Sequence, residues 1–290
     1  IMNTRTGNFP IGFRRGGSAW QKDLPALLQW AKDNGLSGID LGRDADTTGR
    51  LVLDAGLRIG SVDLKEWQGM ISPSKATRRK AVEANAAYIE QNAALGPLNY
   101  FLVMLPEKPE LPRAENFGYM IESFTQLVPA LEAARARIVI EGWPGPGALC
   151  CTPEGYRAFF KAVPAKVIGI NYDPSHLMRM GIDHIRFLRE FAPRVYHVHG
   201  KDTELDAENL YEFGYEQPPT FAKPVAYGGM AWRYCIPGHG QVRWVEVMRI
   251  LAAHKYKGMI SIELEDANFN GAAESEQQGI LLGARFLAGC

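Results

Sequence analysis

The feature that most constrains this chain is an eightfold alternation of short apolar segments with longer segments of helical pattern. The apolar segments are rich in Val and Ile, as is typical of strands that are covered on both faces. Between them, apolar residues recur at helical spacing, for example in the stripe of Leu24, Leu27, Leu28 and Ala31 that ends before Gly35. The eight candidate strands are residues 10–14, 37–41, 58–64, 99–105, 137–143, 167–173, 194–200 and 258–264.

This alternation predicts an α/β fold with a closed barrel of parallel strands. Strands that are joined by helices run parallel, and eight such units without a break in composition favour one (β/α)8 TIM barrel. We therefore expect residues 1–290 to form a single TIM-barrel domain with a long loop after the seventh strand. That loop, from Asp202 to about Gln241, has no clear helical or strand period. Its aromatic residues favour a packed flap over the site, and a contact arm in an oligomer is the alternative.

Composition and charge exclude several classes of partner. The formal net charge is zero and the basic residues are scattered, which argues against nucleic-acid or anionic-membrane binding. No apolar run approaches the roughly 20 residues that cross a bilayer, and the first residues lack the apolar core of a signal peptide, although a leader already removed would leave no trace. The four cysteines follow no zinc or redox spacing. We expect a cytoplasmic protein, as a monomer or homo-oligomer, that acts on a small molecule.

Four polar residues lie near the C-terminal ends of the last four candidate strands. They are Glu141, Asp173, His199 and Glu263. Because parallel strands of a barrel present their C-terminal ends on one face, these side chains are expected to converge. Three carboxylates and one imidazole form a harder ligand set than the Cys and His of structural zinc sites. The set predicts one divalent metal ion, with Mn²⁺ favoured and Mg²⁺, Co²⁺ or Zn²⁺ as alternatives; any one acid alone is explained as well by a salt bridge.

Three further residues are candidates for substrate binding. His176 follows Asp173 by three residues in the motif DPSH, and His239 lies between glycines in the motif PGHG. Lys201 can balance an oxyanion, or it can simply pair with Asp202.

Other residues near these motifs have more than one interpretation. His197 shares a strand face with His199 and is either buried in the barrel or a donor that orients a ligand. Glu265 is the second choice for the ligand on the eighth strand. Trp67 and Trp143 are candidate apolar walls for a ring-shaped substrate, and each is explained equally well as a core residue.

Five motifs, IEGW, NYDPSHL, HVHGKD, IPGHGQVRW and YKGMISIELE, resemble the xylose isomerase-like superfamily of sugar isomerases and epimerases. The resemblance covers residues 137–265 well and the first four strands only through their overall pattern. Ketose 3-epimerases of this superfamily carry a matching Glu, Asp, His, Glu set on strands five to eight. The resemblance implies that His176 contacts substrate and that Glu141 and Glu263 act as acid and base. It also implies the metal ligands, namely Glu141, Asp173, His199 and Glu263.

The expected function is that of a divalent-metal-dependent sugar isomerase or epimerase. Such an enzyme abstracts a proton next to a carbonyl, and the metal stabilises the resulting enediolate. The alternative is a metal-dependent lyase or dehydratase of 3-keto-glycosides or related keto-sugars, because a leaving group β to the carbanion would be expelled. A non-catalytic sugar-binding barrel and an abasic-site endonuclease are less favoured. The endonucleases of this superfamily carry histidines on early loops, whereas this chain has none before His176.

Overall fold

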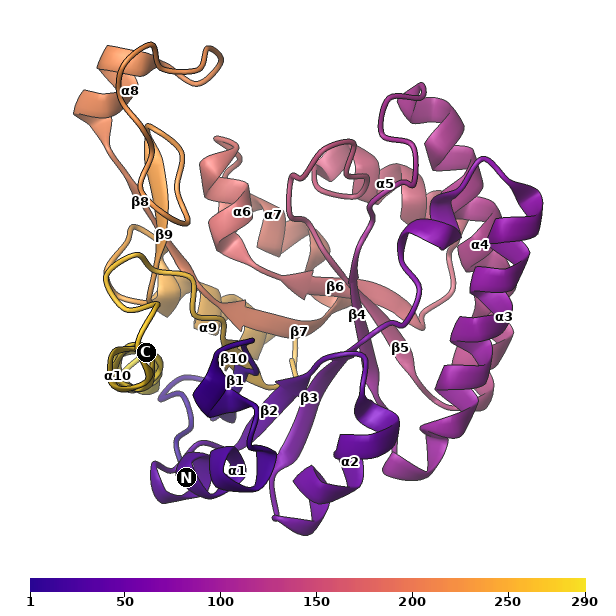
Figure 1. Ribbon diagram of the computed structural model, residues 1–290, viewed down its shortest axis with the longest axis horizontal. Helices are drawn as coiled ribbons and strands as arrows, with labels where there is room; N and C mark the ends of the chain where they lie inside the picture. The colour runs from indigo at the N-terminus through magenta and orange to yellow at the C-terminus, as the bar shows by residue number, and fades with distance from the viewer. The chain divides into compact units, whose positions relative to one another are not determined.

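The computed structural model describes all 290 residues, and its main feature is a closed barrel of parallel strands with helices between them (Figure 1). This confirms the predicted TIM barrel. The strands are neighbours in the order β1-β10-β7-β6-β5-β4-β3-β2. Their bounds are β1 Ile11–Arg14, β2 Gly38–Leu41, β3 Arg58–Asp63, β4 Asn99–Val103, β5 Arg137–Glu141, β6 Ile168–Tyr172, β7 Val195–Gly200 and β10 Ile260–Ile262.

The chain packs as two compact units. One comprises Ile1–Gly38, Asp173–Glu190 and His199–Cys290, and the other comprises Ile39–Tyr172 and Phe191–Val198. We call them the first and the second unit and describe each by itself. That residues 1–290 behave as a single domain stays a prediction. None of the helices combines the length and the apolar composition that a membrane-spanning helix needs.

The second unit contains a run of parallel strands in continuous register. Val103 of β4 is opposite Glu141 of β5, and Glu141 is opposite Asn171 of β6. Local signals explain where its helices begin: Ser74 caps α3 by accepting from the amide of Thr77, and Thr152 caps α5. The helices are α2 Ala45–Asp54, η2 Gln68–Ile71, α3 Lys75–Gln91, η3 Ala93–Leu95, α4 Arg113–Ala133, α5 Pro153–Ala162 and η4 Ala192–Arg194.

In the first unit, β1 pairs in parallel with β10, with Ile11 opposite Ile260. The predicted apolar stripe is the buried face of helix α1, whose first turn is capped by Asp23. The helices are η1 Ala19–Gln21, α1 Leu24–Asp33, α6 Pro174–Arg179, α7 His184–Phe191, α9 Trp244–Ala253 and α10 Ala273–Ala288; α7 ends one residue beyond the unit.

The long connection after β7 is more regular than its sequence indicates. β8 Asp202–Leu205 and β9 Trp232–Cys235 form an antiparallel pair, and α8 Ala207–Phe213, which follows β8 in the chain, lies at the outer end of this pair (Figure 1). Helix α8 buries no residue, and Tyr211 and Phe221 are 89% and 96% exposed. We call this connection, residues 202–241, the arm. Its tip is therefore not the packed flap that the sequence favours, whereas β9 at its base is partly buried.

Candidate active site

Asp173 is held by the turn that leads from β6 into α6. Its Oδ1 accepts hydrogen bonds from the amide of Ser175 at 2.9 Å and from the hydroxyl of Ser175 at 2.6 Å, so it caps the helix. Its other oxygen, Oδ2, is buried and accepts no hydrogen bond. Oδ2 lies 3.3 Å from Nε2 of His176 and 3.9 Å from Nδ1 of His199. The capping contact thus fixes the carboxylate while Oδ2 is directed at a polar cluster.

Lys201 is the cation at the centre of this cluster. Its side chain is 1% exposed, and Nζ lies 2.6 Å from Oε2 of Glu263, 2.7 Å from Oε2 of Glu265 and 3.3 Å from Oδ2 of Asp173. The pairing with Asp202 that the sequence left open is not the one formed. Asp202 instead accepts hydrogen bonds from the Trp244 indole and from backbone amides.

The charges around Glu263 keep it ionised. Burial by itself raises the pKa of this carboxyl, but Lys201, His199 and Arg14 together hold it well below its ordinary value. His199 Nδ1 lies 3.3 Å from Oε2 of Glu263, and Arg14 Nε lies 3.4 Å from Oε1. Glu263 is therefore a carboxylate at neutral pH.

The donor set of the first unit fits a divalent metal ion. Asp173 and Glu263 each offer one carboxylate oxygen, and these oxygens lie within 4.8 Å of each other. His199 is fully buried beside them. The oxygen of Asp173 that accepts no hydrogen bond is the type of atom that a metal ion satisfies. Lys201 already supplies one positive charge here. Its ammonium can stay paired with Glu265 when a metal ion binds the carboxylates of Asp173 and Glu263.

Glu141, the remaining predicted ligand, ends β5 in the second unit. It is 4% exposed, and its Oε2 accepts a hydrogen bond from Nδ2 of Asn171 at 2.7 Å. Its position at a C-terminal strand end is the one predicted from the sequence. Its role as a ligand, acid or base stays a prediction.

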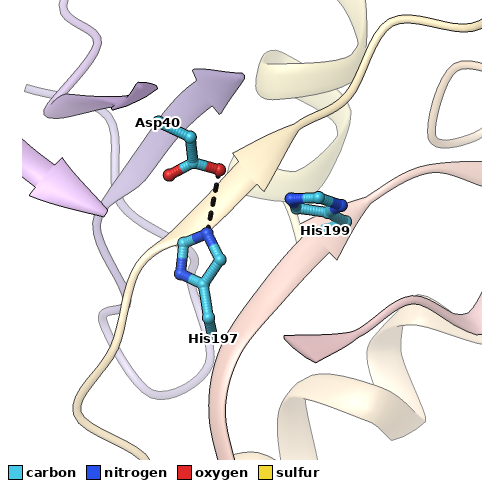
Figure 2. A group of neighbouring side chains, drawn as sticks. All are labelled: Asp40, His197 and His199. Atoms are coloured by element: carbon cyan, nitrogen blue, oxygen red, sulfur yellow. Dashed lines mark hydrogen bonds and ion pairs between the residues drawn. The ribbon is translucent and has the colours of Figure 1, made fainter. Parts of the chain in front are cut away.

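His197 has a partner that sequence reasoning missed. Figure 2 shows the hydrogen bond between its Nε2 and Oδ2 of Asp40 on β2. The two atoms are 2.9 Å apart, and both side chains are fully buried. Oδ1 of Asp40 accepts from the amide of Ser61, which fixes the carboxylate. His199, also labelled in Figure 2, lies two residues further along β7. The available signal was an Asp inside the apolar strand GIDL, because a buried carboxylate requires a partner.

His176 has a definite tautomer because of Tyr234 and Arg179. Arg179 Nη1 donates to the phenol oxygen of Tyr234 at 3.0 Å, and Nδ1 of His176 lies 2.6 Å from the same oxygen. Since a guanidinium accepts no hydrogen bond, the phenol proton is donated to Nδ1 of His176. Burial raises the pKa of Tyr234, so the phenol keeps this proton at neutral pH. With Nδ1 accepting from the phenol, the nitrogen of His176 that is left to donate is Nε2, which faces Asp173.

Most of the chain, residues 22–290, matches the family described as xylose isomerase-like TIM barrel. The chain belongs to this family. An inosose dehydratase of Geobacillus thermodenitrificans (strain NG80-2) is 28% identical over 151 residues, which are 52% of this chain and 48% of that enzyme. The matches to the first curated relatives span between 34% and 48% of those proteins' length.

Solved structures share the architecture at low sequence identity. A D-psicose 3-epimerase in the presence of D-fructose has a TM-score of 0.72 and 13% identity, over 97% of this chain and 100% of that chain. The 3-keto-D-glucoside 4-epimerase YcjR from E. coli has a TM-score of 0.68 and 13% identity, over 96% of this chain and 99% of that chain. These likenesses establish the fold, and both neighbours are enzymes.

The two predicted tryptophan walls of this xylose isomerase-like barrel lie in the second unit. Trp67 and Trp143 are partly buried and pack on a core cluster of Phe101, Val103 and Val139. The Trp67 indole donates to a backbone carbonyl and so has a structural role in any case. A contact between either ring and substrate stays a prediction.

His239 follows Gly238, whose φ of +93° makes the turn that its PGHG motif predicts. The His239 side chain is exposed, and its ring centroid lies 6.0 Å from that of Phe269. It makes none of the ion-pair contacts of Asp173, Lys201 and Glu263 described above. Its role in substrate binding stays a prediction.

Proposed function

We propose that this protein is a divalent-metal-dependent sugar isomerase or epimerase that moves a proton at a carbon next to a carbonyl. The observation that carries the proposal is the buried cluster in which Asp173 and Glu263 lie within ion-pair distance of both Lys201 and His199. Fold neighbours that epimerise D-psicose or 3-keto-D-glucosides support the same chemistry.

The metal ligands we propose are Asp173, His199 and Glu263, with Glu141 as the fourth. Glu141 is included because it ends a parallel strand of the same barrel, and such ends share one face. Mn²⁺ is the favoured ion, since carboxylates outnumber imidazole in the set. A divalent ion held there supplies Lewis acidity that stabilises negative charge on a carbonyl oxygen.

The proton is moved by the chain's own carboxylates. We assign Glu141 and Glu263 as the acid–base pair: one removes the proton and the other returns one, on the opposite face in an epimerisation. His176 donates its Nε2 proton in a hydrogen bond to a substrate oxygen, and Lys201 balances the negative charge that develops there. Because Asp173, His199 and Lys201 are buried, little bulk water competes for these contacts.

Dehydration of a keto-sugar is the second candidate, favoured by the similarity to inosose dehydratases. It begins with the same proton abstraction. If a hydroxyl or glycosidic oxygen lies β to the carbanion, that C–O bond breaks and the proton from the general acid leaves with the oxygen. The two reactions therefore share a base and differ in the fate of the carbanion.

Solvent-exchange NMR tests both possibilities. Purified enzyme with excess Mn²⁺ is given ketoses and 3-keto-sugars in D₂O, and the exchange of the hydrogen next to the carbonyl is followed together with product. Glu141→Gln and Glu263→Gln keep an oxygen for the metal but cannot accept a proton. At metal saturation both variants should be slower by about 10²-fold or more, the scale of general acid–base catalysis.

The two variants should also differ from each other. The one that keeps the abstracting base exchanges substrate hydrogen without forming product, and the other does neither. Near-normal rates in both would reject the two-glutamate mechanism. Absence of exchange in the parent enzyme with every keto-sugar would instead indicate a protein that only binds sugar.

A further inference from the structure

Exposed apolar side chains gather on two surfaces of the first unit. Seven of the ten large apolar side chains that are exposed in this chain belong to the arm or to α10. At the outer end of the arm, Tyr211, Tyr215 and Phe221 are 89%, 56% and 96% exposed. On α10, Leu282 and Phe286 are 36% and 42% exposed. Monomeric proteins rarely gather exposed apolar groups in this way, so both surfaces are candidates for an interface.

The exposed face of α8 is acidic as well as aromatic. Glu208, Tyr211 and Glu212 are all exposed, and their i, i+3, i+4 spacing places them on one face of the helix. The segment 206–216 contains four acidic residues and no Lys, Arg or His. A surface that complements α8 must therefore be basic and apolar.

The outer face of α10 has this composition. Leu282, Arg285 and Phe286 are exposed and repeat the i, i+3, i+4 spacing. Residues 277–290 include no acidic residue. The exposed Arg5 is fixed beside the end of this helix, because its backbone amide donates to a carbonyl of the last turn at 3.1 Å. The two helix faces therefore complement each other both in charge and in apolar character.

The base of the arm is braced, so that α8 is held away from the α10 of its own chain. β8 and β9 pair over four residues each, and at about 3.3 Å per residue they form a strut roughly 13 Å long. Arg233 of β9 forms ion pairs with Glu204 of β8 and with the buried Asp266. Figure 1 shows α8 at the outer end of this strut and α10 beyond its opposite end. A contact between α8 and α10 is therefore one between two copies of the chain.

We propose that α8 of one copy docks on the outer face of α10 of a second copy, and that a two-fold axis repeats the contact in a homodimer. Each copy carries both surfaces, as an interface with two-fold symmetry requires. At about 200 Å² for a fully accessible aromatic side chain, Tyr211, Tyr215 and Phe221 offer roughly 500 Å² per copy. Two arms and the two surfaces that receive them then bury roughly 2,000 Å², the size of a stable specific interface.

Charge reversal at Glu212 and Arg285 tests this pairing, with the mass in solution measured by light scattering after size exclusion over a range of protein concentrations. The parent should have twice the mass of one chain. Glu212→Arg and Arg285→Glu each place like charges at both contacts, and each should raise the dissociation constant of the dimer by about tenfold or more. The matched control, Glu90→Arg on the exposed side of α3, makes the same change of charge outside both surfaces and should dimerise like the parent.

A mixture of the two single variants is the sharpest test. In a heterodimer of Glu212→Arg with Arg285→Glu, each α8 meets an α10 of opposite charge, so the equimolar mixture should dimerise as the parent does. This recovery also shows that both variants are folded. A monomeric parent would overturn the proposal and leave a different protein as the partner of the arm. A dimer that both reversals leave intact, or a mixture that stays monomeric, would overturn it as well, because the contact would then not join α8 to α10.

Discussion

At the scale of single residues, the decisive feature is which ring nitrogen of His176 carries the proton. A histidine beside a proposed metal ligand such as Asp173 can act as a ligand through Nε2 or as a donor through Nε2–H, and the contact on its other nitrogen decides between them. Tyr234 makes that contact. Arg179 donates to the same phenol oxygen and cannot accept a hydrogen bond, so Nδ1 of His176 is the acceptor that the phenol proton has. His176 is thereby a donor, although its spacing from Asp173 alone is compatible with either role.

Tyr234→Phe should release this constraint. Removal of the hydroxyl leaves Nδ1 of His176 without its donor, so the ring should shift towards a mixture of tautomers. Long-range ¹H–¹⁵N spectra of the metal-free protein at neutral pH measure this directly, with the His176 signals assigned from a His176→Asn spectrum. The parent should have an unprotonated Nδ1 and a protonated Nε2. Tyr211→Phe, which removes an exposed hydroxyl of the same arm, should retain the parent pattern; an unchanged tautomer in Tyr234→Phe would refute the role of the phenol.

At the same scale, the sequence indicated some of these residues and concealed others. Asp173, His199 and Glu263 could be found because each lies at the end of an apolar strand, where position predicts convergence. Tyr234 could not be found in this way, since it lies in a stretch that lacks periodicity and its partner Arg179 belongs to a different element. Contacts of that kind depend on the path of a connection, which periodicity does not encode.

At the scale of elements, the eight barrel strands were predictable and the arm was not. Strands β5 and β6 are buried along almost their whole length, so they read as continuous apolar runs. The antiparallel strands DTEL and WRYC have four residues each and mix polar with apolar side chains, which gives too short a signal. The predicted strands also extend past the observed ends, as at 258–264, where pairing covers only Ile260–Ile262.

Glu276 couples helix α10 to the segment after β1, and this coupling should make stability depend on pH. Burial raises the pKa of Glu276, but hydrogen bonds from Trp20, Gly271 and Ser18 outweigh it and lower the pKa below its ordinary value. The folded state therefore binds this proton less readily than the unfolded chain. The stabilisation is complete above the unfolded pKa of about 4.3 and is lost as the pH falls through the folded value.

Urea unfolding at neutral pH and near pH 4 tests this coupling. Glu276→Gln should lower the free energy of unfolding at neutral pH by about 1–3 kcal/mol, the scale of hydrogen bonds to a charged group. The difference between variant and parent should shrink in acid, because the unfolded parent chain then takes up a proton on Glu276 that the folded state binds less readily. Glu274→Gln, an exposed neighbour in the first turn of α10, is the control. A difference that stays constant with pH would mean that the carboxylate charge is not what holds the segment.

At the scale of the whole molecule, the question is whether one barrel unfolds as one domain. The sequence predicts a single domain from the unbroken strand–helix alternation, whereas the chain packs as two compact units. The units are not joined by a linker: β7 itself is divided between them after Val198, and β6 in the second unit runs directly into Asp173 of the first. Neither unit can unfold without interrupting a barrel strand that continues into the other.

We therefore expect one cooperative transition, and the four free cysteines can report it without any substitution. Cys150 and Cys151 are buried in the second unit, and Cys235 and Cys290 are buried in the first. A short pulse of a thiol reagent at each urea concentration, followed by peptide mass spectrometry, measures the exposed fraction at each cysteine.

The midpoints of Cys150, Cys151 and Cys235 should coincide, because opening either unit removes the pairing of β7. Cys290, at the chain end, serves as an internal control for local fraying. A midpoint for Cys235 that is separated from those of Cys150 and Cys151 would show two folding units and would refute the single-domain prediction.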